Sequence, residues 1–322
     1  MLMLCVLVQL IPPACCLAES APAVPSAFDF SHLTLAIDYF ENPSESLLIE
    51  IAGTPAAAHL KRHSDRTGYY PPSTTARDIT SDLLAEIPSH AVLQKVKALY
   101  LFARERPARQ RSCLARAAAY LPIGAQPKNP LHITWGYDIG VAMDDHASLN
   151  FSHGHFLDQP DEIWFYCIHE AHHSGVMQIH PMPLISDIDS VRELYDFVRY
   201  ATFLEGLAVH AARSSRREAG ALGRDRDYVA LEDHEVRNRI LSDYWCHLSA
   251  LREASDLPLN DEHWKVVDQM SSGERLWYVA GAAMANLIER ELGRTGLLES
   301  IEQGPEAFFN TYQEIWTGIS TP

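Results

Sequence analysis

Residues 164–173 read Trp164-Phe165-Tyr166-Cys167-Ile168-His169-Glu170-Ala171-His172-His173, a mostly apolar run that ends in His-Glu-x-x-His. On a helix, His169 and His173 lie four residues apart and project from the same face. That spacing allows two imidazole nitrogens to reach one tetrahedral zinc ion, with Glu170 beside them to accept a proton from water. The run therefore predicts a helical zinc site, and its alternative is an amphipathic helix that carries two histidines by coincidence.

A third protein ligand is needed, because a catalytic zinc ion usually has three protein ligands and a water molecule. Glu205 is the favoured candidate. It lies in the apolar run Phe203-Leu204-Glu205-Gly206-Leu207-Ala208, where an unpaired buried carboxylate would be costly. Its small neighbours Gly206 and Ala208 would let two helices approach closely enough for the carboxylate to reach the metal. A glutamate that is exposed or paired in a salt bridge remains the alternative.

Two histidines are the other candidates for the third ligand. A longer zinc motif places glycine and histidine three and six residues after His173, but Gly175 and His180 are each one residue out of that register. His210 follows Glu205 by five residues, about 140° further round a helix, so the two side chains do not share a direction. A supporting position behind the ligands, or an ordinary place on the surface, suits His210 better.

The composition describes an ordinary folded protein of 322 residues, with 47% hydrophobic and 21% charged residues. That length allows one large domain or two closely joined ones. The formal net charge of -16 argues against a nucleic-acid surface, since phosphates require a dominant basic stripe. Arginine clusters at residues 104–116 and 213–226 are interpreted as solvated faces.

Residues 1–23 resemble a secretory signal peptide. Their apolar core of about 11 residues is too short to span a bilayer, and small residues follow it where cleavage could occur. No lysine or arginine precedes that core. We expect export to the periplasm or the extracellular space, no transmembrane span in the mature chain, and lipid attachment at Cys15 or Cys16 only as a minor alternative.

Three cysteines, Cys113, Cys167 and Cys246, remain after such a signal is removed. An odd number at wide spacing is not a disulfide framework, and at most one pair can form. Cys167 has apolar neighbours, so the sequence predicts a buried thiol there.

The predicted fold is α+β and predominantly helical, with a helical region at 24–130 and a catalytic region at 131–322 that may form one continuous domain with it. Residues 131–143 and 147–151 read as two short strands around an Asp144-Asp145 turn, placed directly before the motif helix. An exposed edge of these strands would accept an extended peptide. We expect Asp161 to cap the motif helix, Ser174-Gly175 to end it, and residues 53–75 to form a loop.

The arrangement of His169-Glu170-x-x-His173 followed by Glu205-Gly206-Leu207-Ala208 resembles the gluzincin group of zinc metallopeptidases. The later Tyr278-Val279-Ala280-Gly281, with Ile288-Glu289 and Gly293 after it, resembles the Tyr-x-x-Gly helix of several bacterial members. The resemblance implies a zincin-like core, one zinc ion held by His169, His173 and Glu205, a peptide or protein substrate, and Tyr278 as the donor to the oxyanion. Val209 stands where the thermolysin-like members carry an aspartate that orients a zinc histidine, so close kinship with them is not expected.

The expected reaction is peptide hydrolysis, in which Glu170 accepts a proton from zinc-activated water and later delivers it to the leaving amine. For the oxyanion, the less favoured donors are His234, Tyr244 and His247, and Tyr278 could instead be a plain core aromatic. His172 is expected to be structural.

Other classes of protein fit the sequence less well. A di-iron carboxylate protein would need a second Glu-x-x-His after Glu170-x-x-His173, and none follows. A zinc-binding protein without catalysis has no need of Glu170. A zinc hydrolase that acts on a bond other than a peptide bond stays open, as do substrate preference and oligomeric state.

Overall fold

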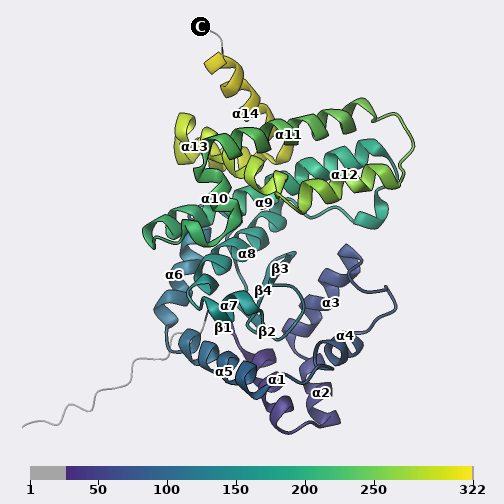
Figure 1. Ribbon diagram of the computed structural model, residues 1–322, viewed down its shortest axis with the longest axis vertical. Helices are drawn as coiled ribbons and strands as arrows, with labels where there is room; N and C mark the ends of the chain where they lie inside the picture. The colour runs from purple at the N-terminus through teal and green to yellow at the C-terminus, as the bar shows by residue number, and fades with distance from the viewer. Residues whose placement is uncertain (1–26, 321–322) are drawn as a thin grey trace, which may run out of the picture.

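The computed structural model describes residues 27–320, so the predicted signal peptide lies outside the described residues (Figure 1). The chain is predominantly helical with one small sheet, which confirms the predicted α+β class. Figure 1 shows the sheet and helix α8 in the middle of the molecule, between the N-terminal helices below and the C-terminal helices above. The first elements are β1 (Phe28–Asp29), α1 (Ser31–Glu41), α2 (Glu45–Ala52), α3 (Pro55–Thr67), α4 (Ala76–Leu83), α5 (His90–Arg104) and α6 (Pro107–Ala118).

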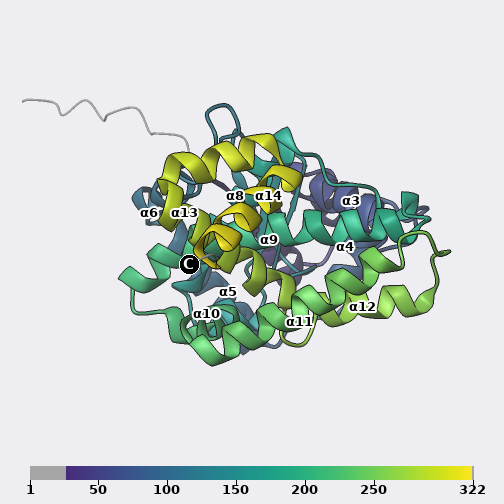
Figure 2. The ribbon, with the colours of Figure 1, turned by 90° about the horizontal axis from the view of Figure 1, so that it is seen from above.

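The remaining elements carry the sheet and the candidate site. They are β2 (Leu131–Thr134), β3 (Gly140–Met143), β4 (His146–Asn150), α7 (Gly154–Asp158), α8 (Glu162–Ile179), η1 (Ile185–Asp187), α9 (Val191–Glu218), η2 (Leu222–Arg224), α10 (Arg226–Glu232), α11 (His234–Glu253), α12 (Asp261–Ser271), α13 (Leu276–Gln303) and α14 (Pro305–Ser320). Seen from above, α9 crosses the centre of the molecule, with α13 and α14 on one side of it and α11 and α12 on the other (Figure 2).

The loop predicted for residues 53–75 is wrong, because α3 occupies most of it. The Thr54 side chain accepts a hydrogen bond from the backbone N–H of Ala57, and Pro55 stands in the first turn. Gly68 ends the helix with a φ of 71°, in the left-handed region that favours glycine. These residues are ordinary signals for the start and the end of a helix. They favour a helix here although few of the residues between them are apolar.

The sheet has four strands in the order β1-β2-β4-β3. The predicted strand over 131–143 is two strands, β2 and β3, separated by bends. β3 pairs antiparallel with β4 through the predicted Asp144-Asp145 turn, whereas β1 and β4 both lie parallel to β2. β1 comes from the region before residue 130, so both regions contribute to one sheet. β3 is an outer strand, which leaves one of its edges unpaired.

Helix α8 differs from its prediction at both ends. Asp161 occupies the N-cap position, but its side chain makes no capping hydrogen bond. The helix passes through Ser174-Gly175 and ends at Ile179. Gly175 serves packing instead of termination, because a Cβ there would lie 2.3 Å from Leu121 and 2.4 Å from the carbonyl oxygen of Ala125.

One hydrophobic core runs from Phe28 to Tyr312 and includes both faces of α8. Cys167 is buried in it, but the predicted free thiol is wrong because Cys167 forms a disulfide with Cys113 and so joins α8 to α6. Cys246 is a free, exposed cysteine. Within residues 27–320, no helix has the length and apolar character needed to cross a membrane.

Candidate metal centre

Two neighbouring helices bring His169, His173 and Glu205 together. The histidines project from one face of α8, and Glu205 reaches them from α9 after the chain has reversed through η1. The Nε2 atoms of the two histidines are 2.9 Å apart, and the Glu205 Oε2 atom lies 3.1 Å from His173 and 3.3 Å from His169. Across the described part of the chain, this is the one group of three or more such side chains close enough to hold a metal ion.

The three ligand atoms fit a small tetrahedral cation. Zinc binds imidazole nitrogen and carboxylate oxygen at about 2.0–2.2 Å, so tetrahedral angles place its ligand atoms roughly 3.3 Å apart. The observed separations of 2.9–3.3 Å are close to that value. Two imidazoles and one carboxylate are also a donor set that zinc commonly takes, with a fourth position left for water.

The electrostatics of the cluster favour a cation. Burial lowers the pKa of His169 to about 4, with the neighbouring His173 acting in the same direction. Burial would raise the pKa of Glu205, but the adjacent histidines outweigh it and hold that pKa well below its usual range. His169 is therefore a neutral nitrogen ligand at neutral pH, and Glu205 is an anionic oxygen ligand.

Glu170 lies beside the cluster on α8, with only 5% of its surface exposed. Burial raises its pKa to about 8, although His173 opposes this. Space for the carboxylate comes from β3, because a Cβ on Gly140 would lie 2.7 Å from Glu170 Oε1. Glu170 is thus a buried carboxyl with a high proton affinity, next to the candidate ligands.

These four residues open into one cavity of about 640 Å³. One wall is β3 and the residue before it, represented by Ile139, Gly140, Val141 and Ala142, which places this outer strand beside the three candidate ligands. The other walls come from α8, α9, α10 and the start of α13. The cavity is large enough for several residues of a peptide.

The other histidine candidates lie elsewhere. His180 stands just after α8, and its Nε2 hydrogen-bonds the carbonyl oxygen of Ile301 at 2.7 Å. His210 is buried, so the surface interpretation is wrong; its Nε2 contacts Glu289 Oε2 at 2.6 Å. His172 points to the carbonyl oxygen of Tyr120, at 3.2 Å, in keeping with a structural role.

Among the candidate oxyanion donors, only Tyr278 lines the cavity. Burial raises its pKa, so its hydroxyl keeps its proton at neutral pH. Tyr244 is fully buried and hydrogen-bonds Thr202 at 2.9 Å, while His234 lies on the surface and contacts Arg237. His247, which is partly buried on α11, is likewise absent from the cavity wall.

The glycine of the Tyr-x-x-Gly sequence, Gly281, is needed for helix packing. α9 and α13 cross where Gly206 meets Gly281, and a Cβ on either glycine would lie within 2.3 Å of the other helix's backbone. Gly281 thereby lets α13 approach α9 closely, and Tyr278, one turn earlier, stands near Glu205. The expectation that Gly206 allows α9 to approach α8 is wrong, because its partner is α13.

Val209 stands where an aspartate would orient a zinc histidine, so any such partner has to come from elsewhere in the chain. Its side chain lines the cavity, and its carbonyl oxygen accepts a hydrogen bond from the Tyr228 hydroxyl. Within residues 27–320, the buried Nδ1 of His173 has no hydrogen-bond partner. An unpaired buried polar group costs roughly 1–3 kcal/mol, and no side chain among these residues replaces the missing aspartate as a partner of this nitrogen.

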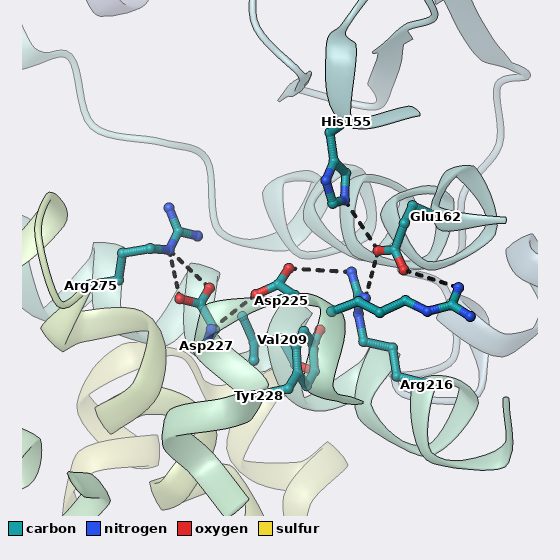
Figure 3. Close-up of polar contacts among 9 residues, drawn as sticks. His155, Glu162, Val209, Arg216, Asp225, Asp227, Tyr228 and Arg275 are labelled. Carbon is teal, nitrogen blue, oxygen red and sulfur yellow. Dashed lines mark hydrogen bonds and ion pairs between the residues drawn. The ribbon is translucent and has the colours of Figure 1, made fainter. Parts of the chain in front are cut away.

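The cavity wall carries a network of charged side chains that sequence patterns do not predict (Figure 3). Arg216, placed at sequence level on a solvated face, is only 2% exposed and contacts Glu162 at 2.6 Å and Asp225 at 3.3 Å. Arg275 donates from Nε to both carboxylate oxygens of Asp227, at 2.8 and 2.9 Å. No periodicity marks such residues, because their partners come from different helices.

Comparison with known proteins gives one family. A family model described as "Putative zinc dependent peptidase (DUF5700)" matches residues 94–318. No curated protein and no solved structure matches the chain significantly. The matched region includes α6 to α13 and all three candidate ligands, His169, His173 and Glu205. The family description agrees with a zinc-dependent peptidase. Because the match covers more than half of the sequence, the chain belongs to this family of putative zinc dependent peptidases.

Proposed function

We propose that this protein hydrolyses peptide bonds with one zinc ion held by His169, His173 and Glu205, in the manner of a gluzincin. The observation that carries the proposal is the convergence of these three ligand atoms, 2.9–3.3 Å apart, beside the buried carboxyl of Glu170. Two histidines from one helix and a glutamate from the next are the arrangement that the resemblance implies. Glu170 favours catalysis over metal storage, because zinc binding does not require it.

When bound, zinc supplies Lewis acidity, which lowers the pKa of a water molecule and polarises a peptide carbonyl. The Glu170 carboxylate would accept a proton from the attacking water molecule and later give it to the leaving amine. Its burial supports this role, since burial raises the pKa of the carboxyl and so its affinity for a proton.

Two further features support a peptide substrate. The unpaired edge of β3 runs along the cavity, so an extended peptide has backbone groups there with which to form hydrogen bonds. The Tyr278 hydroxyl reaches the same cavity as a neutral donor, the kind of group that stabilises an oxyanion. We also infer a zincin-like core, which the position of β3 beside α8 and of Glu205 on α9 supports.

Export of the protein is part of the proposal. The Cys113–Cys167 disulfide supports it, because disulfides persist in the periplasm and outside the cell and are rare in the reducing cytosol. Attachment to a membrane through a lipid remains a minor alternative.

Replacing Glu170 with glutamine tests the function. The amide keeps the shape of the side chain but cannot accept the proton, so kcat should fall by about 10²–10⁴-fold while zinc stays near one ion per chain. The measurements are metal content by mass spectrometry and cleavage of a mixed peptide library. Unchanged cleavage by the variant, or iron in place of zinc, would overturn the proposal.

Replacing Glu205 with alanine tests the third ligand. Loss of residues that merely support ligands weakens metal binding by about 10–100-fold, so loss of a ligand should exceed that range. Glu218→Ala is a matched control on the same helix, because Glu218 is exposed and pairs with Arg116. Zinc titration against a chelating indicator gives the affinities. Full affinity in Glu205→Ala would return His180 to consideration.

A further inference from the structure

Arg275 stands immediately before α13 on the wall of the cavity that contains the metal cluster. Its guanidinium carbon lies 3.3 Å from the centre of the Tyr278 ring, so one face of the group is stacked. Its Nε donates to both oxygens of Asp227, at 2.8 and 2.9 Å. Two independent contacts therefore fix the plane and the direction of this guanidinium.

The carboxylate that holds Arg275 is itself firmly placed. Asp227 is 4% exposed and lies in the first turn of α10, whose N-cap residue Asp225 contacts the buried Arg216 at 3.3 Å. Arg216 in turn contacts Glu162 of α8 at 2.6 Å. Figure 3 shows these pairs as a row that runs from α8 to the start of α13. Arg275 thus stands at one end of a row of polar contacts that reaches α8 through Asp227, Asp225 and Arg216.

The two terminal nitrogens of Arg275 are available. Figure 3 shows them on the far side of the guanidinium from Asp227, and neither has a hydrogen-bond partner in the described residues. Of the other arginines on the cavity wall, Arg216 is already engaged by two carboxylates, and Arg226 donates to the Gly273 carbonyl oxygen. Arg224 is 44% exposed, and its nearest carboxylate is as far as 4.0 Å away. Its guanidinium is therefore not held in one direction.

The chemistry of this fork fits a carboxylate. Two parallel N–H groups on a planar guanidinium match the two oxygens of a carboxylate, and a fixed guanidinium loses little entropy when it binds. Asp138 also lines the cavity, and its carboxylate would repel an anionic substrate. An acidic peptide therefore needs a fixed cation at the point where its charge enters.

We propose that Arg275 is the specificity-determining residue of this site and binds a carboxylate of the peptide substrate through Nη1 and Nη2. The carboxylate belongs either to the C-terminus of the peptide or to an acidic side chain near the cleaved bond. This inference rests on the proposed peptidase function, because it names the substrate class of the same cavity.

Binding to the Glu170→Gln protein, as purified with its metal, tests the inference without turnover. The probes are an acetylated pentapeptide of alanine and leucine with a free C-terminal carboxylate, the same peptide with a C-terminal amide, and amides that carry one glutamate at each position in turn. Isothermal titration should show at least one acidic probe binding about 10–100-fold more tightly than its neutral match. The free acid and the glutamate series distinguish the two sources of the carboxylate.

Substitutions then assign the preference to Arg275. In the Glu170→Gln protein, the further change Arg275→Gln should bring the acidic and neutral probes to equal affinity. Arg275→Lys should keep only part of the difference in affinity, since lysine lacks the paired N–H donors of a guanidinium. Arg224→Gln is the matched control, because it removes one positive charge from the same wall and should leave the preference intact. Asp227→Asn keeps the arginine but loosens its hold, and it should reduce the preference if Arg275→Gln fails to fold.

Equal affinities for acidic and neutral probes, no measurable binding of any acidic probe, or a preference that survives Arg275→Gln would each overturn the inference. Its failure is separable from failure of the proposed function. Glu170-dependent cleavage with no preference for acidic peptides defeats only the role of Arg275. A charge preference in a protein that cleaves nothing defeats only the peptidase activity.

Discussion

Gly140 is a position where a single methyl group decides the geometry of the site. A Cβ there would lie 2.7 Å from Oε1 of Glu170 and 2.9 Å from its Cδ and Cγ atoms. The carboxylate would have to move out of its place beside the metal cluster, whereas the backbone of β3 would stay where it is. Gly140→Ala should therefore lower kcat by roughly 10²-fold or more, as a displacement of about 1 Å at a reacting group does.

The thermal midpoint of Gly140→Ala should change little, since the clash falls on one side chain at a cavity. Gly154→Ala is the control, because no atom lies within 4 Å of a Cβ at that position. Peptide-cleavage rates and thermal unfolding of the three proteins provide the measurements. Full activity in Gly140→Ala would show that Glu170 has no fixed position, which contradicts its assignment as the general base.

At the scale of elements, α9 and α13 are joined by polar contacts as well as by the glycine crossing. Glu289 of α13 contacts His210 of α9 at 2.6 Å and Arg294 at 2.6 Å. The hydrogen bond from His210 is the main reason that the pKa of Glu289 falls from its ordinary 4.5 to about 2. A carboxylate with a depressed pKa stabilises the fold above its unfolded pKa, and that stability is lost as the pH falls toward 2.

Glu289→Gln should consequently lower the free energy of unfolding at pH 7 by about 1 kcal/mol, after allowing for solvent screening of a partly exposed group. The difference between the two proteins should shrink below pH 4.5, because the wild-type side chain is then protonated in the unfolded state. Urea unfolding at pH 7 and pH 3.5 measures both values. A difference that stays constant or grows at pH 3.5 would contradict the assigned pKa.

How far the sequence predicts these elements depends on how local the cause is. Helix α8 and its pair of histidines follow from spacing within one turn, and Glu205 follows from the cost of burying a lone carboxylate. The close crossing of Gly206 and Gly281 is different, because its two residues belong to helices far apart in the chain. The same holds for Arg275 and Asp227, whose ion pair exists only after α10 and α13 have packed.

At the scale of the whole molecule, the sheet and the core connect the two regions that the sequence divides at residue 130. β1 pairs with β2 across that boundary, and helix α6 packs on α8. The Cys113–Cys167 disulfide ties the same two helices covalently. The site therefore lies on a helix that is packed against and covalently joined to an element from the region before residue 130.

The disulfide encloses 54 residues, and chain entropy gives about 4 kcal/mol for closing a loop of that length in the unfolded state. Replacing Cys113 and Cys167 together with serine should lower the free energy of unfolding by up to that amount, measured in guanidinium chloride. Cys246→Ser is the control, since this exposed cysteine is free and its loss should change stability by less than about 0.5 kcal/mol. Dithiothreitol should reproduce the effect in the wild-type protein but not in the double variant. An unchanged midpoint in all of these would contradict the prediction, and would mean that the packing of α6 on α8 holds the two helices together without help from the disulfide.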